Sequence, residues 1–247
     1  MKEVRTIIWD LDETVWFYEE DETKILCKKM KITQEERFKV EYYKMWDNLL
    51  PYFKDVIVTR DKVMKYIEEQ MPILKVFNIS SSDFMQTLRE EKRNMVRVNE
   101  DAIKMMKYLK EKGLKNISIT DYFTADQEIA LKEINALIYI EKVYGCDNVY
   151  FKNSIGRVSQ VIEELKIEKR REEFVMIGDS ISSDIFFARK LGIKSIWFNR
   201  KGKINKTSNI PTMEISSLLE LKNIFWNKKR RKYAKLSSFC IYKNEQQ

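Results

Sequence analysis

The sequence predicts an α/β protein with a mostly parallel sheet, helices on both faces of that sheet, and an all-helical insertion after the first strand. Three observations predict this fold. The chain opens on a short apolar segment that leads into two aspartates, a long stretch with helical patterns follows, and from about residue 100 strands and helices alternate. Alternating elements of this length imply right-handed crossovers between parallel strands, which place helices on both faces.

The first predicted strand is the segment VRTIIW at residues 4–9. It is rich in β-branched and aromatic residues and has no polar alternation, as expected for a strand that is buried on both faces. It runs directly into Asp10 and Asp12. The protein therefore begins with a buried strand that has acidic residues at its carboxyl end.

Residues 15–99 contain helical patterns and little that resembles a strand. Thr33 and Glu36 have the spacing of a capping box at the start of a helix, and Thr59 precedes a second helix. A serine at 81–82 is expected to begin a third helix, DFMQTLREEKR. These patterns predict an all-helical insertion.

The alternation begins after Asn99, which we expect to cap a helix that Gly113 closes. The remaining predicted strands are at 116–120, near KVYG, at 174–178 and at 194–199. The remaining predicted helices are one that Thr124 caps, one from about Ser154 to Leu165, and a last one that ends at Gly192. Residues 1–14 and 100–226 therefore form the predicted α/β core, 15–99 the helical insertion, and 227–247 a basic tail.

The composition excludes several kinds of chemistry. The chain of 247 residues has no histidine, which excludes Ser-His-Asp and Cys-His triads and zinc sites with histidine ligands. Cys27, Cys146 and Cys240 are too far apart for a four-thiolate zinc site or a dense disulfide framework. No window approaches the roughly 20 apolar residues of a membrane span. We expect a soluble protein in a reducing, cytoplasmic compartment, with no membrane partner.

The net charge of +8 comes mostly from the basic tail. Six lysines and arginines lie within residues 228–235, without an acid among them. Such a run can bind the phosphate backbone of a nucleic acid, which is an alternative function for this chain. Because the run is short, terminal and not interleaved with a sheet of aromatic residues, a solvated terminal segment is the favoured interpretation.

Polar residues follow several of the predicted strands, at the edge where ligands of open parallel sheets bind. The acids gathered there would repel one another unless a cation joined them. Mg²⁺ prefers oxygen ligands and leaves room for a phosphate, so it is the expected cofactor. The residues are Asp10 and Asp12 after the first strand, Thr120 and Asp121 after the second, Lys152 ahead of the helix at 154–165, and Asp179 and Asp184 after the strand at 174–178.

These residues resemble the four motifs of the haloacid dehalogenase superfamily, in its phosphatase branch. IIWDLDETV resembles the first motif, SIT the second, the lysine of VYFKN the third, and GDSISSD the fourth. They occur in the family order across residues 1–14 and 100–226. The resemblance implies a Rossmann-like core, and it implies that 15–99 is a helical cap of the C1 type.

The resemblance also implies the catalytic roles. Asp10 is the expected nucleophile, which accepts the phosphoryl group as an aspartyl-phosphate. Asp12 is the expected acid for the leaving oxygen and then the base that activates water. Thr120, Asp121 and Lys152 are expected to bind the substrate phosphate, with Lys152 also holding the nucleophile. For Thr120 and Asp121, capping of the following turn is the alternative.

The expected Mg²⁺ ligands are the Asp10 carboxylate, the Asp12 backbone carbonyl, and Asp179. Asp184 is expected either to bind the metal directly or to accept a hydrogen bond without touching the metal. A third interpretation is that Asp184 is an acid favoured by the dipole at the N-terminus of the next helix.

Three features depart from the family pattern or leave an alternative open. Glu13 replaces the glycine that most often follows the second aspartate. Lys152 lacks the proline that commonly follows it, and Lys142 is the alternative lysine. The aromatic segment at 16–18 lies in the first linker of the insertion, where packing is favoured over stacking on a substrate base.

The sequence thus predicts a phosphoric monoester hydrolase that uses Mg²⁺ and acts on a small phosphorylated metabolite, such as a nucleoside monophosphate or a sugar phosphate. Asp12 favours phosphoryl transfer over dehalogenation, because a departing halide needs no proton. A phosphomutase of the same superfamily and a nucleic-acid-associated protein are the alternatives. The sequence favours neither a monomer nor a dimer.

Overall fold

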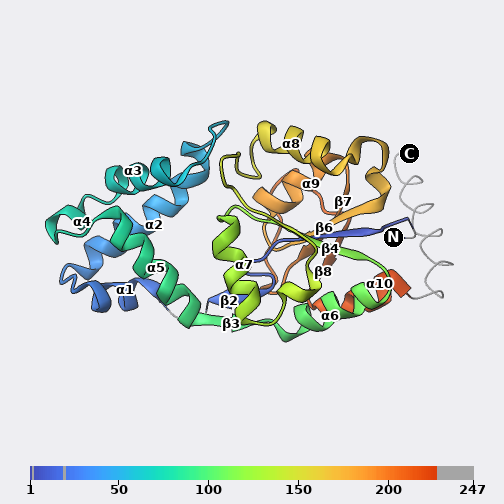
Figure 1. Cartoon of the computed structure of the whole chain (residues 1–247), viewed down its shortest axis with the longest axis horizontal. Helices are drawn as coiled ribbons and strands as arrows, with labels where there is room; N and C mark the ends of the chain where they lie inside the picture. The colour runs from blue at the N-terminus through green and yellow to red at the C-terminus, as the bar shows by residue number, and fades with distance from the viewer. Residues whose placement is uncertain (2, 19–20, 227–247) are drawn as a thin grey trace, which may run out of the picture.

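The computed structural model describes residues 1, 3–18 and 21–226. The predictions for the basic tail at 227–247, and for Cys240 within it, lie outside these residues. Figure 1 shows the chain as a helical region joined to an α/β region. Within the described residues, no helix is both long and apolar enough to cross a membrane.

The α/β region is built on a six-stranded sheet in which every paired neighbour is parallel, as predicted. The strand order is β5-β4-β1-β6-β7-β8, so the first strand of the chain lies in the middle of the sheet. The strands are β1 (Thr6–Trp9), β4 (Lys115–Ile119), β5 (Val143–Tyr144), β6 (Phe174–Gly178), β7 (Lys194–Phe198) and β8 (Met213–Ile215).

Helices cover both faces of this sheet, which confirms the predicted fold class. In Figure 1, α8 and α9 lie on one face, and α6, α7 and α10 lie on the other. The central strands explain why, since successive buried side chains point to opposite faces. Ile7 and Trp9 of β1 pack into one core, and Ile8 packs into the other. The helices are α6 (Glu100–Glu111), α7 (Thr124–Glu133), α8 (Ile155–Leu165), α9 (Phe186–Leu191) and α10 (Leu221–Trp226).

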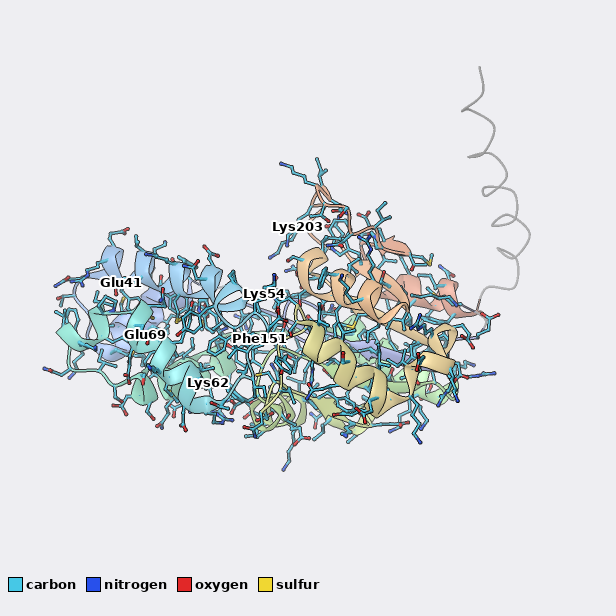
Figure 2. The ribbon with its side chains drawn as sticks, turned by 90° about the horizontal axis from the view of Figure 1, so that it is seen from above. Glu41, Lys54, Lys62, Glu69, Phe151 and Lys203 are labelled. Carbon is cyan, nitrogen blue, oxygen red and sulfur yellow. The ribbon has the colours of Figure 1, made fainter. Side chains whose placement is uncertain are left out.

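The helical region has an aromatic core of its own. Phe38, Tyr42 and Phe84 pack together with ring centroids 5.8–6.3 Å apart. Phe151 of the α/β region is buried in this same core and meets Phe53 edge to face at 5.7 Å; Figure 2 shows it at the junction of the two regions. The helices are α1 (Glu22–Met30), α2 (Glu35–Tyr52), α3 (Arg60–Gln70), α4 (Ile73–Val76) and α5 (Ser81–Met95).

A two-stranded antiparallel ribbon joins the regions, which the sequence did not predict. β2 (Trp16–Tyr18) pairs with β3 (Val96–Val98), so the chain enters and leaves the helical region through adjacent strands. The expectation that 15–99 contains little strand is wrong at these two ends. Three-residue strands are too short to show an alternating pattern, and the pairing joins residues about 80 positions apart.

Several helix starts also differ from their predictions. Thr59 caps α3 as expected, because its hydroxyl accepts the Lys62 N–H. The predicted capping box is wrong, since the helix begins after Gln34 with no side-chain cap. Ser80 rather than 81–82 caps α5. α7 begins at Thr124, with Phe123 in the cap position.

Three further elements, α6, α9 and β8, differ in how well the sequence predicts them. Asn99 occupies the cap position of α6, but its side chain donates to the Thr14 carbonyl instead of capping the helix. Gly192, with φ of 69°, ends α9 as expected. The edge strand β8 was not predicted. It is three residues long with a half-buried, an exposed and a buried residue, which gives a weak sequence signal.

Candidate active site at the carboxyl edge of the sheet

The polar residues that follow the strands line one cavity of about 340 Å³. It lies at the carboxyl edge of the sheet, where α5 and α2 of the helical region contribute Lys92 and Trp46. All seven site residues predicted from the sequence are brought together here: Asp10, Asp12, Thr120, Asp121, Lys152, Asp179 and Asp184.

Asp10 is held at the end of β1 by backbone and side-chain contacts. Its N–H donates to the Ile177 carbonyl at 2.9 Å, which continues the pairing of β1 with β6 past the end of the strand. Its carboxylate accepts a hydrogen bond of 2.6 Å from the Lys152 ammonium. The nucleophile candidate is therefore fixed in the middle of the sheet edge, beside a positive charge.

Lys152 is the lysine of the site, and the alternative Lys142 is not. The Lys152 side chain is 3% exposed, and its Nζ lies 2.6 Å from Asp10 Oδ1 and 2.6 Å from Asp184 Oδ1. Lys142 is exposed and lies over the Tyr144 ring at 4.3 Å. The missing proline after Lys152 has not prevented the lysine from reaching the nucleophile candidate.

The charges at this edge are unbalanced. Burial and the neighbouring Asp184 raise the pKa of Asp10 well above its ordinary value, and burial also raises the pKa of Asp184. Burial acts to lower the pKa of Lys152, but Asp10 and Asp184 outweigh it, so this pKa is raised. One ammonium group cannot neutralise two buried carboxylates and the third one nearby. The site favours an additional cation.

The carboxylates are arranged to accept that cation. Asp10, Asp179 and Asp184 each offer an oxygen atom, and these oxygens lie within 4.8 Å of one another. Burial, followed by the effect of Asp184, raises the pKa of Asp179 to about 6. Hard divalent cations such as Mg²⁺ select oxygen donors of this kind. The residues present therefore fit a Mg²⁺ ion.

Gly178 and Ser180 place Asp184 in this group. A Cβ atom on Gly178 would overlap the Asp184 carboxylate, so no larger residue fits at the end of β6. Asp184 Oδ2 accepts the Ser180 N–H at 3.0 Å, inside the π-turn Ile181–Ile185 that precedes α9. The glycine of the GDSISSD segment is thus required by the side chain six residues later.

Asp12 is held by neutral donors from outside the sheet. Its Oδ1 accepts hydrogen bonds from Tyr18 Oη at 2.7 Å and from Trp16 Nε1 at 3.1 Å, and its Oδ2 accepts one from Gln127 Nε2 at 3.1 Å. Trp16 and Tyr18 belong to the ribbon strand β2, and Gln127 belongs to α7. The aromatic linker therefore packs as favoured from the sequence, and it also orients Asp12.

Thr120 and Asp121 have different surroundings. The Thr120 hydroxyl is buried in the site and accepts the Tyr122 N–H at 3.2 Å, which leaves its own O–H free to donate into the cavity. Both oxygens of Asp121 are engaged, one by the Lys152 N–H at 2.6 Å and one by the Ser183 hydroxyl at 3.2 Å. Asp121 ties the lysine segment to the turn that carries Asp184.

Glu13 lines the same cavity, but its carboxylate is paired with cations of a neighbouring loop. Its φ is 57°, so it occupies the left-handed conformation in which glycine is favoured. Its carboxylate pairs with Lys201 at 2.8 Å and with Arg200 at 3.6 Å. The departure from the family pattern is explained by these pairs, which join the first motif to the loop after β7.

The sequence did not identify Lys92, Tyr122, Trp46, Ser183 or Gln127 as site residues, although all five line the site or hold its residues. Lys92 lies in a run of alternating charges on α5, and Gln127 lies in the middle of α7. Neither position carries a local signal, because Gln127 reaches Asp12 through the packing of α7 on the sheet edge and Lys92 reaches the cavity through the packing of the two regions.

Comparisons with known proteins agree on one family. The family of haloacid dehalogenase-like hydrolases matches residues 4–192. The YfnB protein of Bacillus subtilis, which is named as a HAD-hydrolase, is 22% identical over 229 residues, covering 91% of this chain and 96% of that protein.

Solved structures share the fold. The structure of YfnB bound to magnesium has a TM-score of 0.71 at 21% identity, covering 90% of this chain and 99% of that one. A HAD phosphatase from Thermococcus onnurineus has a TM-score of 0.62 at 24% identity, with 91% and 97% covered. A 2-haloacid dehalogenase from Pseudomonas syringae has a TM-score of 0.58 at 16% identity, with 90% and 97% covered.

Proposed function

Because this chain belongs to the haloacid dehalogenase-like hydrolases, we propose that it is a phosphatase that uses Mg²⁺ and hydrolyses a small phosphomonoester through a phosphoryl group carried on Asp10. The family contains both phosphatases and dehalogenases, as the structural neighbours illustrate. Asp12 is the observation that favours a phosphatase. An alkoxide leaving group needs a proton, whereas a halide does not, and Asp12 lines the cavity that contains the nucleophile.

In the first step, an Asp10 oxygen attacks phosphorus, and the bond from phosphorus to the leaving oxygen breaks. Asp12 donates a proton to that oxygen, so the alcohol departs neutral. Lys152, paired with Asp10 at 2.6 Å, keeps the nucleophile in place and attracts the phosphate oxygens. The Thr120 hydroxyl donates to one of them.

In the second step, water attacks phosphorus while Asp12 accepts its proton, and the bond between phosphorus and Asp10 breaks. Inorganic phosphate leaves, and both aspartates return to their starting states. Splitting one difficult hydrolysis into two displacements is the advantage of covalent catalysis. Asp121 contributes by positioning Lys152 rather than by binding the phosphate, because its oxygens accept hydrogen bonds from the Lys152 N–H and the Ser183 hydroxyl, and an anionic carboxylate repels a phosphate.

A bound Mg²⁺ would be held by Asp10, Asp179 and Asp184 together with the backbone carbonyl of Asp12. Its positive charge would offset the negative charge of the phosphate and of the carboxylates. The substrate is proposed to be a small phosphorylated metabolite, such as a sugar phosphate or a nucleoside monophosphate. The buried free thiols of Cys27 and Cys146 support a reducing compartment, so we place the protein in the cytoplasm.

The test is phosphate release from a panel of phosphomonoesters, with Mg²⁺ or with a chelator, for the wild type and Asp10→Asn. We expect release that requires the metal and falls at least ~10³-fold in the variant, because the nucleophile is lost. Asp101→Asn, on α6 away from the site, is the matched control and should keep full activity. Halide release from a 2-haloacid without phosphate release from any monoester would show a dehalogenase instead.

A further inference from the structure

Lys92 brings a largely buried positive charge from α5 to the active-site cavity. Its side chain is 16% exposed, and it lines the cavity together with the reacting aspartates. Its ammonium lies 4.9 Å from the ring centre of Tyr18, 5.1 Å from that of Trp46 and 5.3 Å from that of Tyr122. Three aromatic faces stabilise a cation here, at the boundary of the two regions.

The hydrogen-bonding capacity of Lys92 is not filled by the described residues. An ammonium group has three N–H donors, and one of them is used in a hydrogen bond of 3.1 Å to Tyr122 Oη. The Glu22 carboxylate lies at 3.8 Å, which is too far for a hydrogen bond. Two of the three N–H donors of Lys92 are therefore available to a ligand in the adjacent cavity. Such a ligand would be favoured, because a buried charge without its hydrogen bonds is costly.

Lys92 lies on the Asp12 side of the cavity, where the leaving group of the substrate would be bound. Tyr18, whose ring faces Lys92, donates to Asp12, and Asp12 is the group that protonates the leaving oxygen. Lys152 lies instead with Asp10, where the phosphoryl group is transferred. The site therefore has two buried lysines, one for the transferred phosphoryl group and one beside the rest of the substrate.

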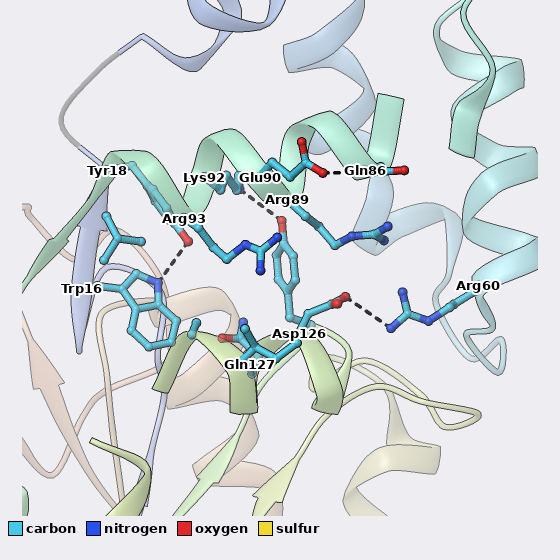
Figure 3. A pocket seen from close by; sticks show the side chains of 14 residues that line it. Trp16, Tyr18, Arg60, Gln86, Arg89, Glu90, Lys92, Arg93, Asp126 and Gln127 are labelled. Carbon is cyan, nitrogen blue, oxygen red and sulfur yellow. Dashed lines mark hydrogen bonds and ion pairs between the residues drawn. The ribbon is translucent and has the colours of Figure 1, made fainter. Parts of the chain in front are cut away.

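Positive charge continues beyond Lys92. Tyr18, Lys92 and Tyr122 also line a second cavity of about 380 Å³, between α5 and α7. Figure 3 shows Arg89 and Arg93 of α5 along one side of it, opposite Asp126 and Gln127 of α7. Arg89 has no hydrogen bond or ion pair within the described residues, and four basic residues against two acidic ones line this cavity.

We infer that Lys92 binds a second anionic group, on the leaving-group side of the substrate, so that this enzyme prefers phosphorylated acids to phosphorylated alcohols. The inference rests on the proposed phosphatase activity and specifies its substrate class. Burial acts to lower the pKa of Lys92, but Tyr122, Glu22 and Asp12 outweigh it and raise this pKa. The lysine is thus charged at neutral pH, as this role requires.

The test compares substrates that differ in one group. 3-Phosphoglycerate carries a carboxylate where glycerol 3-phosphate carries a hydroxymethyl group, and phosphoglycolate and 2-hydroxyethyl phosphate form a shorter pair. We expect kcat/KM to favour the acid by roughly 10- to 100-fold in at least one pair, mainly through KM, since a hydrogen bond to a charged group is worth that much.

Lys92→Met should reduce this preference to about twofold or less, and Lys92→Arg should keep a large part of it. Lys75→Met, at an exposed position on α4, is the matched control and should keep the wild-type preference. Circular dichroism and thermal unfolding establish that each variant folds. If Lys92→Met does not fold, the wild-type ratio and the Lys92→Arg ratio remain decisive.

Equal kcat/KM for acid and alcohol in both pairs would overturn the inference and leave the phosphatase proposal intact. The same holds if Lys92→Met folds and retains the preference. Absence of phosphate release from every monoester would instead overturn the phosphatase proposal, and the inference with it.

Discussion

Asp10 and Asp12 are two residues apart, yet two different parts of the molecule hold them. The sheet edge holds Asp10 by charge, with the buried Lys152 shared between Asp10 and Asp184. The ribbon strand β2 and helix α7 hold Asp12 by neutral hydrogen bonds to both of its oxygens. A nucleophile has to stay in one place through both steps, and a buried ion pair provides that.

Asp12, which acts as the acid and then as the base in the proposed mechanism, has to lose a proton and regain it. Each hydrogen bond that the described residues make to the Asp12 carboxylate comes from a neutral donor, so its protonation does not break an ion pair at hydrogen-bond distance. The comparison therefore separates two functions. In the proposed mechanism, the sheet edge fixes the site of bond formation, and the ribbon orients the group that transfers the proton.

Replacement of the lysine at the sheet edge should have the largest effect. Lys152→Met leaves Asp10 and Asp184 buried and unpaired, so we expect phosphate release to fall by about 10³-fold or more and the free energy of unfolding to fall by roughly 3–5 kcal/mol. Urea unfolding and steady-state kinetics measure the two effects. Mg²⁺ should recover part of the stability, because it offsets the same carboxylates.

Lys142→Met is the matched control for that experiment. Lys142 is exposed and contacts the Tyr144 ring, so both activity and stability should stay close to those of the wild type. Loss of activity in Lys142→Met with retention in Lys152→Met would contradict the assignment of the sheet-edge lysine.

A change in the ribbon should have a smaller effect that depends on the leaving group. Tyr18→Phe removes the 2.7 Å hydrogen bond to Asp12, and we expect kcat for an alkyl phosphate to fall roughly tenfold through misorientation of the acid. p-Nitrophenyl phosphate needs no protonation of its leaving group, so release of p-nitrophenolate should fall much less. An equal fall in kcat for both substrates would show that Tyr18 does not assist proton transfer to the leaving group.

The smallest expected effect concerns the two buried thiols, Cys27 on α1 and Cys146 after β5. Burial raises the pKa of Cys27 to about 11 and raises that of Cys146 as well. The neutral thiol is the unreactive form, so alkylation at pH 8 should leave both unmodified in the folded protein. Labelling of Cys27 should accelerate about tenfold per pH unit until its pKa is reached. Mass spectrometry of peptides after iodoacetamide treatment measures this.

The sequence predicts the sheet, and it predicts which polar residues meet at the carboxyl edge of that sheet, for a physical reason. A buried parallel strand shows itself as a short apolar run, and the polar residue that follows it is brought to the common edge by the fold. Asp10, Thr120 and Asp179 each follow such a run. Their convergence is therefore predictable without knowledge of any long-range contact.

The ribbon and the lysine of α5 could not be predicted in this way. The bond from Gln127 to Asp12 joins residues 115 positions apart, and Lys92 meets Tyr122 across 30 positions and two regions. Local patterns do not record which helix face meets which strand end. Gln127 meets Asp12 only when α7 packs on the sheet edge, and Lys92 meets the cavity only when the two regions pack together. The sequence therefore could not narrow the proposed substrate beyond a small phosphomonoester.

The most direct test of the account is detection of the phosphoryl group on Asp10. With p-nitrophenyl phosphate, Asp12→Asn can complete the first step, because p-nitrophenolate departs without a proton, but it lacks the base for the second. The account predicts a burst of p-nitrophenolate close to one per protein molecule, and a mass increase of about 80 Da, the mass of one phosphoryl group, on the peptide that contains Asp10 after acid quenching. Phosphate release in step with p-nitrophenolate and no mass increase on that peptide would contradict it.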